Sequence, residues 1–142
     1  MFGLKVKSAF FDSAPVRRAV DKTTRRVLSR FGSFVRSDDR KSMRKRKGAS
    51  RPGRPPSVHV GTLKRLIFFA YDFARRSVVI GPVLFASRSK GVPEALEEGG
   101  TTTTFTRRGR RRQHVDARPH TGPAFQKNLP QVPNLWRDSV RR

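Results

Sequence analysis

A run of positive charge that ends in proline and glycine constrains the first half of this chain. Eight lysines and arginines and no acid lie between Arg40 and Arg54, and Pro55 and Pro56 follow directly. Charge of this density requires solvent or an anionic partner around it. Proline and glycine also end a helix, so any helix that precedes the run must stop within it. The run therefore predicts both a helix end and a surface for anions.

The composition suits a small folded core with charged extensions. The chain has 142 residues, 33 basic against 10 acidic, a formal charge of +23 and eleven phenylalanines. We expect one domain over residues 1–142, with the basic loop of residues 40–60 and a basic hairpin tip of residues 107–112 projecting from it. Charge of one sign repels itself in an isolated monomer, so the composition favours a protein that works inside an assembly.

Other classes of protein are disfavoured. The chain contains no cysteine, which excludes disulfides and thiolate metal sites. The first seven residues hold no long apolar segment, and the longest uncharged runs, residues 66–71 and 77–87, are too short to span a bilayer. We therefore expect no secretory signal, no membrane partner and a cytoplasm-like setting.

The first half of the chain predicts a short strand and then a long amphipathic helix. Residues 4–11 are rich in apolar and β-branched side chains, which favours a strand. Asp12 or Ser13 can cap a helix with Pro15 in its first turn, and the pattern can continue to about residue 47, with Gly48 as its C-cap. The apolar stripe of this helix is expected at Val16, Ala19, Val20, Val27, Leu28, Phe31, Phe34 and Val35, opposite a basic face.

The rest of the chain predicts hairpins and short helices. After a loop over residues 48–60 and one helical turn at 63–66, strands at 67–71 and 77–80 form a hairpin. A helix at 92–98 precedes a second hairpin, whose return strand is expected at 113–117. A last helix from Thr121 is expected to break at Pro130 and Pro133 and to restart at 134–140. The order predicts an α+β fold: an antiparallel sheet of hairpins packed by one long N-terminal helix and a C-terminal helix, with extended basic loops.

Catalytic chemistry is poorly represented. His114 and Asp116, with His120 nearby, could ligate a metal or form an acid–base set, but we favour surface residues because neighbouring arginines would repel a cation. Glu94, Glu97 and Glu98 are interpreted as charges of a short helix. The sequence contains no phosphate-binding glycine loop, nucleophile elbow or zinc spacing. We expect a protein that is not an enzyme and has no cofactor or metal.

The basic patches carry the strongest functional signal. Their side chains suit phosphates, with solvated charge or an acidic face of a protein neighbour as alternatives. No aromatic residue interrupts either patch, so a stacking platform for single strands is not expected. Trp136 favours core packing, with an interface anchor as the alternative. The predicted contact residues are Arg40, Lys41, Arg44, Lys45, Arg46, Lys47, Arg51 and Arg54 in the loop, and Arg107, Arg108, Arg110, Arg111 and Arg112 in the hairpin tip.

Several short motifs follow one another along the chain. They are RKRKG at 44–48, PGRPP at 52–56, HVGTLK at 59–64, IFFAYD at 67–72, SVVIGP at 77–82, VPEALE at 92–97, ARP at 117–119 and GPA at 122–124. In this order and spacing the chain resembles the tail-component family of long-tailed bacteriophages, from about residue 15 to the end. In that family an apolar aromatic pair follows the Arg-Pro, whereas His120 and Thr121 stand there in this chain.

The resemblance implies a structural protein of the virion neck. Such a protein forms a ring, a hexamer first and a dodecamer second, that joins the head connector to the tail tube during tail completion. Its partners would be head-closure or connector proteins, tail-terminator or tail-tube proteins, and packaged DNA through phosphate contacts. Its location would be the virion, and the host cytoplasm during assembly.

Composition alone also fits a nucleic-acid-binding protein, such as a ribosomal or nucleoid component. That alternative predicts strong affinity for duplex or RNA that falls steeply with salt. A neck subunit is expected to assemble with its partner rings and to bind free nucleic acid weakly.

Overall fold

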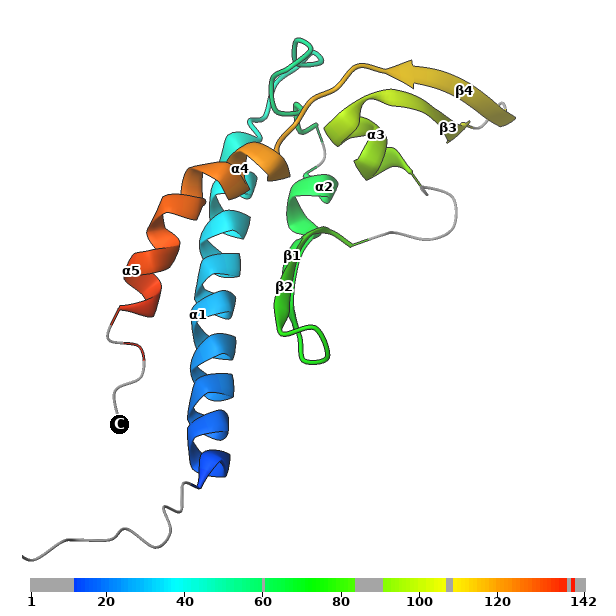
Figure 1. The fold of residues 1–142 in the computed structure, drawn as a ribbon. Coiled ribbons are helices and arrows are strands. Elements are labelled where there is room, and N and C mark those ends of the chain that lie inside the picture. Colours follow the sequence, from blue (N-terminus) through cyan, green and yellow to red (C-terminus); the bar gives the residue numbers. More distant parts are fainter. Residues whose placement is uncertain (1–11, 60, 84–90, 107–108, 138, 140–142) are drawn as a thin grey trace, which may run out of the picture.

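The long first helix is the axis on which the other elements pack. The structure, a computed structural model, describes residues 12–59, 61–83, 91–106, 109–137 and 139. Helix α1 (Ser13–Ser42) has the C-terminal helices along one side and the first hairpin along another, while the second hairpin lies near its C-terminal end (Figure 1). The fold is α+β, as predicted, with two separate two-stranded antiparallel sheets.

Helix α1 begins where the sequence predicts and ends earlier. The Asp12 carboxylate caps it by accepting a hydrogen bond from the Ala14 N–H at 3.0 Å. The predicted end near residue 47, with Gly48 as C-cap, is wrong, because the helix stops at Ser42. Met43 takes an extended conformation and is only 2% exposed, and the Ser42 hydroxyl donates to the Asp39 carbonyl at 2.7 Å. Burial of Met43 thus turns the chain before residues 44–47, whose four adjacent like charges would not favour a further helical turn.

The core lies against the middle of α1. Val27, Phe31 and Val35 are buried, as the stripe predicted. The predicted stripe fails in the first third of the helix, where Val16 and Val20 are 49% and 45% exposed. The main cluster joins Phe31, Val35 and Ala124, with Val78, Ile80, Val132 and Leu135 packed around it.

The first hairpin is confirmed. Strands β1 (Ile67–Asp72) and β2 (Ser77–Pro82) pair antiparallel after the single turn of α2 (Thr62–Arg65), and β2 continues through Gly81 and Pro82 instead of stopping before them. The hairpin approaches α1 at Gly32, where a Cβ atom would lie 2.9 Å from Val78 Cγ2 and 3.0 Å from Phe69 Cδ2. Glycine at position 32 therefore permits this close packing.

The second hairpin differs from the prediction in its register. Helix α3 (Val92–Glu98) is confirmed, and strands β3 (Gly100–Thr106) and β4 (Gly109–Val115) follow it. The return strand begins at Gly109 rather than at residue 113, because the ladder pairs Thr106 with Gly109 and Thr103 with Arg112. Arg110, Arg111 and Arg112 therefore lie in a strand and not at a tip. Arg107 and Arg108, and the strand predicted over residues 4–11, lie outside the described residues.

The last helical segment bends where prolines occur. Helix α4 (Thr121–Asn128) passes through a 3₁₀ turn (Leu129–Gln131) into α5 (Val132–Trp136). The predicted restart over residues 134–140 is wrong in both bounds. Pro133 lies in the first turn of α5, where its missing N–H costs no hydrogen bond, so the helix can begin at Val132.

Candidate anion and subunit interfaces

The basic loop, residues 43–59, folds back on itself and is hydrogen-bonded at its base and at its turn. We call this segment the arm. Lys45 and Val58 form an isolated parallel bridge, and the Val58 N–H donates to the Arg44 carbonyl at 3.1 Å. At the far end, the Gly53 N–H donates to the Ala117 carbonyl at 2.8 Å. The arm is therefore folded back and held beside the segment between β4 and α4 (Figure 1).

A second fastening lies in the middle of the arm. Arg118 Nε donates to the Ser50 carbonyl at 3.1 Å, and Ser50 itself is 5% exposed. Pro56 is also buried. These contacts give the arm a defined conformation with its charged side chains outside, so its cations are held in place by the fold.

The arm encloses a basic pocket. The pocket has a volume of about 280 Å³ and lies where the end of α1 meets the arm. None of the described residues that line it is acidic. We call it the arginine pocket; its lining residues are Ser42, Arg44, Arg46, Arg54, Pro55, Pro56 and Ser57.

The other predicted contact residues of the loop divide into two groups. Lys41, Lys45, Lys47 and Arg51 are exposed. Arg40 is used inside the protein, because its guanidinium donates to the carbonyls of Arg65 at 2.8 Å and Ile67 at 3.0 Å. Burial and the nearby charge of Arg36 lower the pKa of Arg40. Arg40 therefore fastens α1 to β1, and its guanidinium is committed to that contact.

A buried polar junction joins α1 to α4. Asp39, which is 0% exposed, lies 2.8 Å from His120 Nδ1 and accepts a hydrogen bond from the Thr121 hydroxyl at 2.7 Å. His120 is 1% exposed, so its predicted surface position is wrong. On the other side of the ring, Glu97 Oε2 lies 3.6 Å from His120 Nε2, and Nε2 has no hydrogen-bond partner in the described part of the chain.

Glu97 has a role that the sequence reasoning missed. Its carboxylate accepts hydrogen bonds from the backbone N–H groups of His120 at 2.9 Å, Thr121 at 3.2 Å and Gly122 at 2.7 Å. It therefore caps the first turn of α4 from the neighbouring helix α3. No local pattern indicates this role, because the N–H groups that Glu97 accepts from lie 23 to 25 positions further along the chain.

His114, Asp116 and His120, the candidates weighed for a metal or acid–base set, do not come together. His114 and Asp116 lie 3.9 Å apart on the surface, with side chains 73% and 55% exposed, whereas His120 is in the buried junction. Across the described residues, no group of three or more histidine, cysteine, aspartate or glutamate side chains could hold a metal ion.

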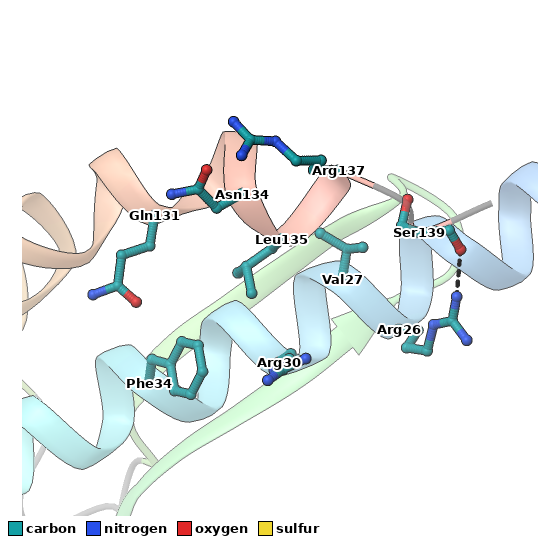
Figure 2. A pocket seen from close by; sticks show the side chains of 9 residues that line it. All are labelled: Arg26, Val27, Arg30, Phe34, Gln131, Asn134, Leu135, Arg137 and Ser139. Carbon is teal, nitrogen blue, oxygen red and sulfur yellow. Dashed lines mark hydrogen bonds between the residues drawn. The ribbon is translucent and has the colours of Figure 1, made fainter. Parts of the chain in front are cut away.

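A groove runs between α1 and the end of the chain (Figure 2). Its volume is about 560 Å³. Val27, Phe34 and Leu135 supply its apolar surface, and Arg26 donates to the Ser139 carbonyl across one end. Trp136 follows Leu135 and keeps 36% of its surface exposed, outside the main core cluster. Trp136 therefore lies outside the main core cluster but is largely covered, and its role as an interface anchor stays a prediction.

The first hairpin exposes an apolar outer face. Successive residues of a strand point to opposite faces, so Phe69, Val78 and Ile80 face α1 while Phe68, Ala70 and Val79 face outward. Phe68 is 45% exposed and Val79 is 61% exposed. The guanidinium groups of Arg36 and Arg40 lie 5.3 and 5.8 Å from the centre of the Phe68 ring and cover part of it. The remaining apolar surface has no cover within the described residues.

Comparisons with known proteins give no relative. The chain matches no protein-family model, no curated protein and no solved structure. Within the described residues, no helix combines the length and the apolar character that crossing a membrane requires.

Proposed function

We propose that this protein is a non-enzymatic structural subunit of a phage neck, which forms a ring between the head connector and the tail tube. The family resemblance of the sequence motifs supplies the phage context. The observation that carries the subunit role is the apolar outer face of the β1–β2 hairpin, where Val79 is 61% exposed. A two-stranded hairpin is marginal by itself, and a neighbouring copy could cover its face or extend its edge.

The first third of α1 supports the same role. Within α1, no residue before Thr23 is buried, although Val16 and Val20 continue the apolar stripe of the helix. A helix of 30 residues is about 45 Å long, so its exposed start extends roughly 15 Å beyond its last packed turn. Such an unpacked amphipathic end suits contact with an adjacent subunit.

The charge indicates that the ring also needs a different partner. Each copy has a formal charge of +23, so identical copies cannot neutralise one another. Several acids of each copy are already engaged inside it, among them Asp38, Asp39 and Glu97. Acidic connector or tail proteins and the packaged DNA are the anionic neighbours that a neck provides.

The assembly experiment uses Val79. The account predicts that the purified protein, or the protein mixed with its connector, forms particles of six or twelve copies, measured as mass by light scattering. Val79→Lys should leave a folded monomer and abolish the particle, because a charge would have to be buried in the subunit contact. Thr62→Lys, which also adds a charge at an exposed position, is the matched control and should assemble normally. A wild-type protein that stays monomeric with its connector would contradict the proposal.

A second experiment tests the arm in infection. In a phage whose own copy of the gene is disrupted, replacement of Arg44, Lys45, Arg46 and Lys47 by Ala should leave heads and tails unjoined in electron micrographs. Normal infectious particles from this variant would refute a role of the arm in joining.

The alternative, a nucleic-acid-binding protein, is favoured by the arm and the net charge alone. It requires strong binding of free duplex or RNA at about 0.15 M salt by an isolated monomer. The neck proposal requires weak binding at that salt together with ring assembly.

A further inference from the structure

We propose that the arginine pocket is a phosphate-binding site that receives the backbone of duplex DNA. The inference deepens the proposed function and rests on it for the source of the DNA, which is the packaged genome. The site consists of Arg44, Arg46 and Arg54 around a cavity of about 280 Å³, with Ser42 and Ser57 also on its wall.

The three guanidinium groups are available to a ligand. In the described part of the chain none of them forms an ion pair with a carboxylate, in contrast to Arg76, which lies 3.4 Å from Asp21. Arginine presents a planar set of donors that fits phosphate oxygens in pairs, and three of them can surround one phosphodiester and its neighbours. The arrangement therefore has the donors for phosphate, and no carboxylate of the described residues competes for them.

The two serines of the pocket wall do not add donors for a ligand. The Ser42 hydroxyl is bonded to the Asp39 carbonyl. The Ser57 hydroxyl has no hydrogen-bond partner within the described residues, but its oxygen is buried and does not face the cavity. The three arginines are therefore the groups that would bind the phosphate.

One effect opposes anion binding here. The pocket adjoins the C-terminal end of α1, which carries roughly half a negative charge from the helix dipole. Three full positive charges outweigh that fraction. In addition, the Arg44 carbonyl near this end is occupied by the Val58 N–H.

Contacts within the chain close the backbone of the pocket. Arg44 and Arg46 lie on either side of Lys45, which forms the bridge with Val58. Arg54 is the last residue of a tight turn, in which its N–H donates to the Arg51 carbonyl at 3.1 Å. Gly53 in that turn has φ +74°, which glycine adopts without strain. Because the backbone is already closed, binding does not have to order the loop, and the loss of entropy on binding is reduced.

The charge of the chain favours DNA over a second copy as the occupant. Every additional copy adds +23 to a ring, so the anion in the pocket has to come from another kind of molecule. Duplex DNA has the densest regular array of negative charge available at such a joint, about one per 1.7 Å of axis. Contacts to phosphates do not depend on base sequence, as a passage for a whole genome requires.

The test compares two triple variants of equal net charge in the full chain. The first is Arg44→Gln, Arg46→Gln and Arg54→Gln. The control is Arg17→Gln, Lys22→Gln and Arg75→Gln, three exposed cations on the start of α1 and the β1–β2 turn, away from the pocket. Binding of a labelled 30-base-pair duplex is measured by fluorescence anisotropy from about 50 to 200 mM salt. Far-ultraviolet circular dichroism verifies the fold of both.

The proposal predicts a clear difference between the variants. The pocket variant should bind at least about tenfold more weakly at 50 mM salt, and its slope of log K against log salt should fall in magnitude by about 2 to 3, since each phosphate contact contributes about 0.9. The control should change the slope by less than about 1. Equal losses in both variants would show that the duplex responds to net charge only, and would overturn the pocket assignment.

Two further measurements fix the ligand. Inorganic phosphate alone should bind with a Kd no tighter than millimolar by calorimetry, because one free ion occupies only one of several contacts. Micromolar binding that displaces the duplex would overturn the assignment to DNA backbone.

Polyglutamate should compete with the duplex only weakly. Polyglutamate binding that depends on the three arginines, with duplex binding that does not, would reassign the pocket to a protein partner. Because these assays use free duplex and purified protein, they can fail while ring assembly succeeds, and the reverse.

Discussion

The buried pair of Asp39 and His120 gives the sharpest stability prediction. Asp39→Ala removes a carboxylate that is 0% exposed and that contacts both His120 Nδ1 and the Thr121 hydroxyl. After the substitution these two groups keep only their contact with each other, at 3.1 Å. A buried polar group that loses its hydrogen-bond partner costs about 1–3 kcal/mol, so the loss of both contacts to Asp39 costs about 2–6 kcal/mol. That cost is a large share of the 5–15 kcal/mol that stabilises a typical domain. With an m value of about 2 kcal/mol per molar urea, the midpoint of unfolding should fall by about 2 M.

The matched control for this prediction lies on the same helix. Asp21→Ala removes a carboxylate 3.4 Å from Arg76, where both side chains are largely exposed, at 49% and 68%. Exposed pairs contribute at most about 1 kcal/mol. Because both substitutions replace aspartate by alanine within α1, the gain in helix propensity is the same and cancels in the comparison. Urea unfolding of the two variants is monitored by circular dichroism. Equal midpoints would refute the claim that the Asp39–His120 junction stabilises the packing of α4 on α1.

Three further predictions concern the packing around α1. Gly32→Leu should destabilise the fold by about 1–3 kcal/mol through overpacking against Val78 and Phe69, whereas Gly48→Leu, with open space around its Cβ, should change stability by less than about 0.5 kcal/mol in the same urea assay. Glu97→Gln should cost about 1–2 kcal/mol by weakening three hydrogen bonds to the first turn of α4, while Glu98→Gln, at an exposed position, should be neutral; equal costs would contradict the capping role. Hydrogen bonds from Asn128 and Lys127 lower the pKa of Asp38 from 3.8, so its stabilising contribution is present above that pH and is lost as the pH falls through the lowered value. Asp38→Asn should therefore unfold more easily than the wild type at pH 7, and the difference should close below pH 3.8; a gap that stays constant with pH would contradict this linkage.

Local signals predicted the elements that local interactions determine. The cap at Asp12, the buried faces at Val27, Phe31 and Val35, and the β1–β2 hairpin all follow from spacing and propensity within a few residues. The end of α1 did not, because it coincides with the burial of Met43 in an extended conformation, and burial depends on the tertiary structure. The exposure of Val16 and Val20 likewise depends on how far along α1 the other helices and strands extend. The periodicity of apolar residues within α1 does not contain that information.

The candidate sites divide in the same way. The basic run was evident from composition, but its closure into an arm depends on hydrogen bonds from Gly53 and Arg118 to partners more than sixty residues away. The junction of Asp39 with His120 joins residues 81 positions apart, so a single sequence gives no sign of it. The expected hairpin tip over residues 107–112 is wrong for Arg110, Arg111 and Arg112, because the register of the ladder places them in β4.

The most direct test of the central claim is the position of this chain in a finished particle. Cryo-electron microscopy of virions from a phage that encodes it should reveal a ring of six or twelve copies between head and tail, with the arginine pockets facing the DNA channel. Absence of the chain from purified virions, or its distribution along the tail tube, would contradict the account.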